Sequence, residues 1–186
     1  MSEVDWTSPY AIIAPDVHEC IHDYGGTGPA VLSCFIREKA KPFLKGCGVD
    51  LGCGLEKVIP EAIGVDNDVM HQWSAANIKT DIWEFEARDL DYVYSSHFLE
   101  HFPDWDRLLA KMCGMLRKGG TLFLYLPNPE ANTGWSFRHS NAARSGHRVD
   151  LSPELVVDKL KELGMKVVEY EPRYDWYASF HVVATK

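Results

Sequence analysis

Residues 49–66 read VDLGCGLEKVIPEAIGVD. The apolar run Val49–Leu51 leads directly into a Gly-x-Gly turn formed by Gly52 and Gly54. Glycine has no Cβ, so this turn can adopt positive φ angles and its backbone can lie directly against a ligand. A second apolar run ends at Asp66. The pattern predicts two parallel strands, with a tight turn after the first and a carboxylate at the tip of the second.

Two classes of nucleotide-type cofactor, NAD(P) and S-adenosylmethionine, suit such a turn, and the spacing separates them. A dinucleotide fingerprint needs a third glycine, and its ribose-binding acid follows about 20 residues later. Here Leu55, Glu56 and Lys57 replace the third glycine, and Asp66 follows much sooner. Glu56 stands where a diphosphate would bind, and its charge repels a diphosphate but tolerates a sulfonium cation. The stretch therefore favours S-adenosylmethionine.

Three further stretches extend this pattern along the chain in a fixed order. Residues 95–102 read SSHFLEHF, residues 116–122 read LRKGGTL, and residues 126–128 read LPN. With the glycine turn, this ordered set resembles the class I S-adenosylmethionine-dependent methyltransferases, particularly the small methyltransferase type 11 group. The resemblance implies a Rossmann-like class I methyltransferase fold. That fold is a three-layer α/β/α sandwich around a seven-stranded, mostly parallel sheet whose last strand is antiparallel.

The alternation of apolar strands and amphipathic helices agrees with a parallel sheet that is covered on both faces. The span between the first two strands is short and contains Pro60, so we expect a turn there in place of a long helix. Ser152 is expected to cap a helix that begins with Pro153. The predicted strands are residues 48–51, 62–66, 77–81, 90–94, 121–126, 166–170 and 179–185, and the predicted helices are residues 30–43, 103–119 and 153–163.

Length and composition predict one domain without a nucleic-acid partner. A chain of 186 residues suits a single domain, 1–186, in which residues 1–45 form a lid or substrate segment and residues 129–150 an insertion on the substrate side. The net charge of −8 argues against a phosphate backbone as the main partner. We find no apolar run long enough to span a membrane and no signal-peptide pattern, so we expect a cytoplasmic protein.

The cysteines predict neither a disulfide framework nor a metal site. Five cysteines are scattered without Cys-x-x-Cys pairing, which is typical of reduced thiols. His18, Cys20 and His22 alternate along the chain, but no second ligand cluster has the usual spacing. We therefore predict no metal.

The resemblance implies a set of cofactor contacts. Asp50, Gly52 and Gly54 would hold the methionine moiety, and Asp66 would bind the ribose. Asp81 and Ile82 would bind the adenine, although Asp81 also suits a plain turn, and the Ser95 backbone would face the sulfonium. The predicted cofactor-binding residues are Asp50, Leu51, Gly52, Cys53, Gly54, Asp66, Asn67, Asp81, Ile82, Ser95 and Ser96.

The methyl acceptor is expected beside the cofactor, at the carboxyl ends of the strands. A histidine near its ordinary pKa of about 6.5 can take a proton from a hydroxyl or an amine. His97 directly follows the fourth strand, so it acts either as this base or as part of the pocket wall. Residues 131–148 contain three arginines and no acid, which favours an anionic small molecule, and a sugar-like acceptor is a further option. We predict His97 and His147 as catalytic, and His97, His101, Trp135, Arg144, His147 and Arg148 as substrate-binding residues.

Three functions from different classes follow. The first is methyl transfer from S-adenosylmethionine to a small-molecule acceptor. The second is a non-catalytic S-adenosylmethionine-binding partner or regulatory subunit, because the chain has no separate substrate domain. The third, an NAD(P)-dependent oxidoreductase, is disfavoured by the missing third glycine and by the absence of a Tyr-x-x-x-Lys pair after the fourth strand. The sequence does not define the oligomeric state.

Overall fold

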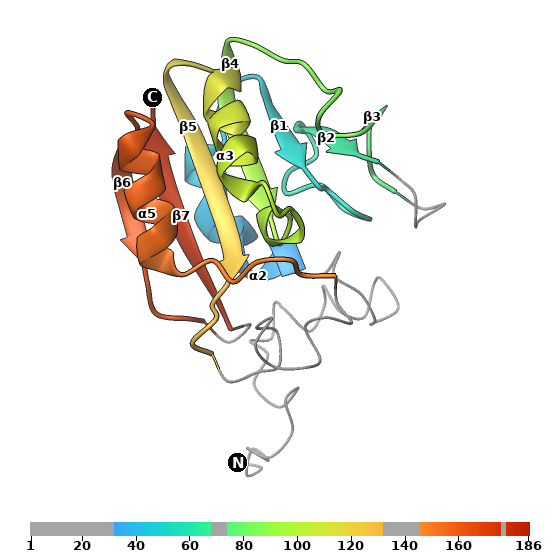
Figure 1. The fold of residues 1–186 in the computed structure, drawn as a ribbon. Coiled ribbons are helices and arrows are strands. Elements are labelled where there is room, and N and C mark those ends of the chain that lie inside the picture. Colours follow the sequence, from blue (N-terminus) through green and yellow to red (C-terminus); the bar gives the residue numbers. More distant parts are fainter. Residues whose placement is uncertain (1–31, 68–73, 132–145, 176–177) are drawn as a thin grey trace, which may run out of the picture.

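The computed structural model describes residues 32–67, 74–131, 146–175 and 178–186. Within them, one seven-stranded sheet has the strand order β3-β2-β1-β4-β5-β7-β6 (Figure 1). The strands are β1 (Gly48–Leu51), β2 (Ile63–Asp66), β3 (Ile78–Lys79), β4 (Leu90–Ser96), β5 (Leu116–Pro127), β6 (Lys166–Glu171) and β7 (Ser179–Thr185).

The sheet is mostly parallel, as predicted, and its last strand runs the other way. The pairs β1·β2, β1·β4, β2·β3 and β4·β5 are parallel. Strand β7 lies between β5 and β6 and pairs antiparallel with both. The carboxyl ends of β1, β4 and β5 therefore meet at one edge, which is the lower edge in Figure 1.

Helices cover both faces of the sheet and create two apolar cores. Helices α3 (Trp105–Met115) and α5 (Pro153–Glu162) lie on the near face in Figure 1, and α2 (Leu32–Ala40) lies on the far face. The larger core contains Leu108, Leu109 and Met112 of α3 together with Val156, Val157 and Leu160 of α5. The smaller core packs Ile36 and Ala40 of α2 against Tyr92, Tyr94, Phe123 and Tyr125 of the sheet.

Several local predictions are confirmed. Residues 52–62 contain no helix, so the connection between β1 and β2 is a turn. Ser152 caps α5, because its Oγ accepts a hydrogen bond from the Leu155 N–H at 3.2 Å, and Pro153 is the first residue of that helix. The predicted helix over residues 30–43 is described from Leu32 to Ala40 and continues as a short 3₁₀ helix, Lys41–Phe43.

The boundary between α3 and β5 differs from the prediction. The helix ends at Met115 and the strand begins at Leu116, whereas the sequence predicts a helix to residue 119. Leu116 has an extended backbone and pairs with Leu90 of β4, so pairing in the sheet outweighs the local helical pattern. Strand β3 is also shorter than predicted, and β4 continues beyond Tyr94 to Ser96.

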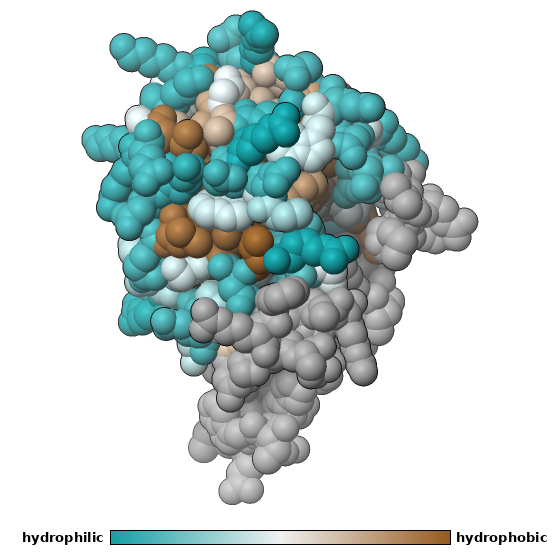
Figure 2. Space-filling model, in the orientation of Figure 1, coloured by the Kyte–Doolittle hydropathy of each residue, from teal (hydrophilic) through white to brown (hydrophobic). Residues whose placement is uncertain are grey.

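The described surface on the side of α3 and α5 is largely hydrophilic (Figure 2). Apolar colour there is confined to small patches between polar side chains. The most exposed large apolar side chains among the described residues are Ile78, Leu155, Val168 and Tyr174.

Candidate cofactor and acceptor site

The glycine turn after β1 is held against the end of β2 by two backbone donors. The Gly52 N–H donates to the Val65 carbonyl at 2.9 Å, and the Gly54 N–H donates to Oδ2 of Asp66 at 2.9 Å. Gly52 and Gly54 have φ angles of +72° and +57°, which a side chain would strain. The turn and the Asp66 carboxylate therefore form one rigid unit.

Gly52 also permits a close approach by an aromatic ring. A Cβ at this position would lie 2.3 Å from Cδ2 of Phe98, well inside van der Waals contact. Phe98 in turn packs on Phe102, with 4.8 Å between the ring centroids. The segment after β4 thus lies directly on the glycine turn.

Asp50 supports the turn from inside the fold. Its carboxylate is 2 % exposed, and Oδ2 accepts a hydrogen bond from the Val58 N–H at 2.6 Å. Burial raises the pKa of Asp50 to about 7, although the Val58 hydrogen bond and Arg37 act in the opposite direction. Asp50 thereby fixes the segment that connects β1 to β2.

Two serines end β4 beside this turn. The Ser95 Oγ donates to the Leu51 carbonyl at 3.1 Å and so joins the tips of β1 and β4. The Ser96 Oγ is buried and has no hydrogen-bond partner among the described residues. A buried hydroxyl without a partner is costly, so this position fits a polar ligand group at the carboxyl edge.

The other predicted cofactor residues occupy varied positions. Oδ1 of Asp81 accepts a hydrogen bond from the Trp83 N–H at 2.8 Å, which is the geometry of a turn. Leu51 and Ile82 are buried in the larger core, so their side chains pack inside the fold. Cys53 is buried and Asn67 is exposed.

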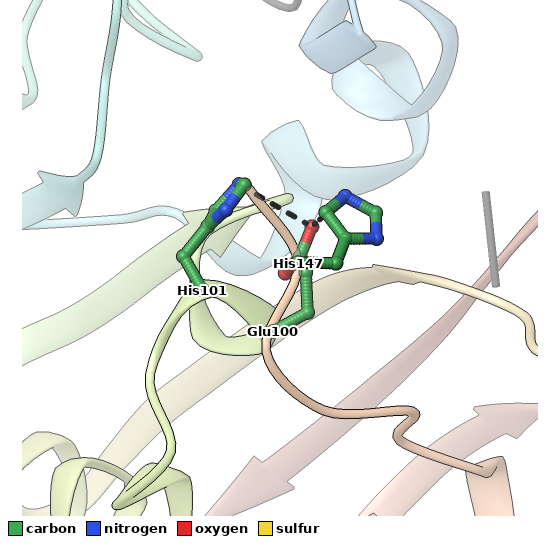
Figure 3. Close-up of side chains that lie close together, drawn as sticks. All are labelled: Glu100, His101 and His147. Carbon is green, nitrogen blue, oxygen red and sulfur yellow. Dashed lines mark ion pairs between the residues drawn. The ribbon is translucent and has the colours of Figure 1, made fainter. Parts of the chain in front are cut away.

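Four titratable side chains, those of His97, Glu100, His101 and His147, lie close together near the carboxyl end of β4. Glu100 and His101 belong to the 3₁₀ helix η3 (Leu99–His101), and His147 belongs to the segment that precedes α5. Oε1 of Glu100 lies 3.5 Å from Nδ1 of His97, 4.0 Å from Nε2 of His101 and 3.7 Å from Nε2 of His147. Figure 3 shows the His101 and His147 rings on opposite sides of the Glu100 carboxylate.

The structure thus brings together three of the predicted acceptor residues, His97, His101 and His147. It also adds Glu100, which lies in the SSHFLEHF stretch but is not among the predicted site residues. Burial raises the pKa of Glu100 to about 8. The available signal was a Glu-His dipeptide four residues after the end of a strand that stops at the ligand-binding edge.

The surroundings of His97 bear on its predicted role as a base. Its Nε2 lies 2.9 Å from the Ser179 Oγ, and its Nδ1 faces Glu100. Burial, together with the neighbouring His147 and His101, lowers the pKa of His97 to about 3. A base that works near neutral pH needs a pKa near neutrality. Of the two predicted roles for His97, general base or part of the pocket wall, this environment therefore favours the pocket wall.

The remaining acceptor residues are only partly placed. Arg148 is exposed, and its backbone N–H donates to the Glu100 carbonyl at 2.8 Å. Its backbone therefore lies next to the histidines. Trp135 and Arg144 lie outside the described residues, as do residues 1–31 with His18, Cys20 and His22. Glu56 forms an ion pair with Arg37 at 2.9 Å. Both residues line a pocket of about 410 Å³ on the α2 side of the sheet.

Comparison with known proteins identifies the family. A family model described as a methyltransferase domain matches residues 15–172. Phosphoethanolamine N-methyltransferase 2 of Caenorhabditis elegans is 25% identical over 77 residues, which are 41% of this chain and 17% of that protein. This chain therefore spans less than a fifth of that curated relative's length.

Solved structures share the fold at low sequence identity. A complex of a methyltransferase activator with a methyltransferase from Haloferax volcanii contains a chain with a TM-score of 0.61 and 15% identity, covering 94% of this chain and 98% of that one. A methyltransferase from Archaeoglobus fulgidus has a TM-score of 0.58 and 18% identity, covering 91% and 99%. Magnesium protoporphyrin IX methyltransferase from Synechocystis with bound S-adenosylmethionine has a TM-score of 0.57 and 14% identity, covering 97% and 89%.

No helix within the described residues has the length and apolar character that crossing a bilayer requires. The strand order, the clamped glycine turn and the match over residues 15–172 agree with one another. The chain belongs to the class I family of S-adenosylmethionine-dependent methyltransferases.

Proposed function

We propose that this protein transfers the methyl group of S-adenosylmethionine to a small anionic acceptor. The observation that supports this most directly is the Gly52–Gly54 turn, clamped to Asp66 at the carboxyl edge of the sheet and lying beside the tip of β4. Membership of the family sets aside the NAD(P) oxidoreductase. Release of S-adenosylhomocysteine over a panel of acceptors tests the proposal and separates an active enzyme from a non-catalytic binding subunit.

The cofactor would be held by backbone groups and a few side chains. We assign the methionine moiety to the backbone of residues 51–54, which the buried Asp50 supports. We assign the ribose to Asp66 and Asn67. Asp81 and Ile82 would border the adenine, and Ser95 and Ser96 would face the sulfonium. The bound cofactor supplies a methyl group that its positive sulfur already activates, so the protein has mainly to align the acceptor and exclude water.

Replacing Asp66 by alanine is expected to weaken S-adenosylhomocysteine binding by about 10- to 100-fold, the value of a hydrogen bond to a charged group. The same change leaves the Gly54 N–H without its acceptor, so the turn loosens as well. Isothermal titration calorimetry measures the affinity. Asp66→Asn keeps an acceptor for Gly54 and is expected to lose less; equal affinity in all three proteins would contradict the assignment.

The acceptor would lie against the histidines, with a basic segment over it. His97 and His147 are buried beside Glu100, and His101 is partly exposed. Residues 131–148 carry arginines and no acid. The name of the Caenorhabditis elegans relative denotes a phosphorylated amine as its substrate, which agrees with an anionic acceptor. Trp135, Arg144 and Arg148 would contribute a stacking surface and positive charge.

Replacing Arg144 and Arg148 together by alanine is expected to raise the KM of the acceptor by about 10-fold or more, because charge-assisted hydrogen bonds to an anion are lost. The affinity for S-adenosylhomocysteine should stay unchanged. Arg173→Ala is the matched control, since Arg173 is an exposed arginine that pairs with Glu171 at 2.9 Å. Steady-state kinetics decide the matter, and an unaltered KM in the double variant would refute the anionic acceptor.

A further inference from the structure

Glu100 is an unusual carboxylate for a protein interior. Its side chain is 0 % exposed, and neither carboxylate oxygen receives a hydrogen bond of normal geometry from the described residues. Buried carboxylates are normally paired through hydrogen bonds or coordinate a metal, because removing them from water is expensive. Three imidazole nitrogens face its Oε1, at 3.5 Å from His97, 3.7 Å from His147 and 4.0 Å from His101.

The Glu100 carboxylate and the Nε2 atoms of His101 and His147 form a compact donor set. Oε1 of Glu100, Nε2 of His101 and Nε2 of His147 all lie within 4.8 Å of one another (Figure 3). Ligands that each lie about 2.0–2.2 Å from one tetrahedral ion are about 3.3–3.6 Å apart. Small side-chain rotations would bring these three atoms to that spacing.

The backbone holds the two ligand segments together. The N–H groups of Arg148 and Val149 both donate to the Glu100 carbonyl, at 2.8 and 3.2 Å. Gly146 has a φ of +81°, and a Cβ there would lie 3.5 Å from Nδ1 of His101. The segment that carries His147 is therefore fixed beside η3.

We propose that Glu100, His101 and His147 bind a divalent transition-metal ion of the zinc type. Two imidazoles and one carboxylate are the ligands that Zn²⁺ and its neighbours prefer, whereas Mg²⁺ and Ca²⁺ prefer oxygen alone. Three protein ligands leave one position open, as in catalytic zinc sites. The spacing of the three residues along the chain matches no common metal motif, so this site is absent from the predictions made from sequence.

The site also suggests a use for the ion. The site follows β4 at the carboxyl edge of the sheet, where the family binds its ligands. The backbone of Arg148 lies beside it. An oxygen of the acceptor in the open position would lose its proton more readily, because a bound cation lowers the pKa of its ligands. This role depends on the proposed methyl transfer, whereas metal binding itself does not.

Titration of the metal-free, full-length protein with Zn²⁺ alone tests the site. We expect one ion per chain by calorimetry, and Co²⁺ in place of Zn²⁺ should produce the visible absorption of a cobalt site with nitrogen ligands. His101→Ala and His147→Ala should each weaken binding by at least about 10-fold. His181→Gln is the matched control, because His181 also lies near a glutamate, at 2.9 Å from Glu169, but its ring stacks on Phe123 of the smaller core.

His101 is 36 % exposed, so its alanine variant should fold even if the His147 variant does not. Unchanged Zn²⁺ affinity in His101→Ala, or tighter binding of Mg²⁺ than of Zn²⁺ by the wild type, would overturn the site. Titration of the same samples with S-adenosylhomocysteine separates the two proposals. Loss of metal binding with intact cofactor binding would leave the methyltransferase proposal in place.

Discussion

Replacing Gly52 by alanine is expected to abolish measurable S-adenosylhomocysteine binding and to destabilise the fold by at least about 2 kcal/mol. A φ of +72° costs an alanine about 1–2 kcal/mol, and its Cβ at 2.3 Å from Phe98 forces the ring to move. The displaced ring and turn would no longer present the backbone that we assign to the methionine moiety. Calorimetry measures binding, and urea unfolding measures the free energy of unfolding.

Gly114→Ala is the matched control for this change. Gly114 lies near the end of α3, and a Cβ there meets no atom within 4 Å. Because alanine is a better helix former than glycine, this variant should gain up to about 1 kcal/mol of stability and bind the cofactor normally. If the Gly52 variant binds S-adenosylhomocysteine as tightly as the Gly114 variant, the turn does not contact the cofactor.

Replacing Asp50 by asparagine is expected to remove a strong pH dependence from the free energy of unfolding. The folded-state pKa of Asp50 is about 7 and its ordinary value is 3.8, so the folded protein holds this proton more tightly than the unfolded chain. The resulting stability is fully present below about pH 4 and is lost as the pH rises to about 7. Three pKa units correspond to about 4 kcal/mol at most.

Asparagine keeps an oxygen that can accept the Val58 N–H, and it has no proton to lose. The stability of Asp50→Asn relative to the wild type should therefore rise between about pH 4 and 7 and stay constant above that range. Asp91→Asn should instead lose stability relative to the wild type as the pH rises toward about 4 and show no change between about pH 4 and 7, because hydrogen bonds from Cys47 and Arg117 lower the pKa of Asp91 below its ordinary 3.8. Parallel stability curves for the wild type and the Asp50 variant would show that Asp50 ionises normally.

The family and the fold could be predicted from local sequence because their signals are local. A turn such as Gly52–Gly54 needs glycine wherever it occurs, and the order of apolar strands and amphipathic helices limits the possible sheets. The prediction of seven strands with an antiparallel last strand is confirmed, as is the cofactor family. The predicted end of the third helix at residue 119 is wrong, because long-range pairing of Leu116 with Leu90 of β4 ends the helix at Met115.

The chain's own sequence determined the glycine turn, the acid that closes it and the alternation that forms the sheet, since each depends on neighbours along the chain. Only the tertiary structure decided which titratable groups meet. Glu100 and His147 are far apart in sequence, and two hydrogen bonds to the Glu100 carbonyl bring their segments together. Burial then changes the chemistry of Glu100 and His97, because a charge excluded from water depends on whatever the fold places beside it.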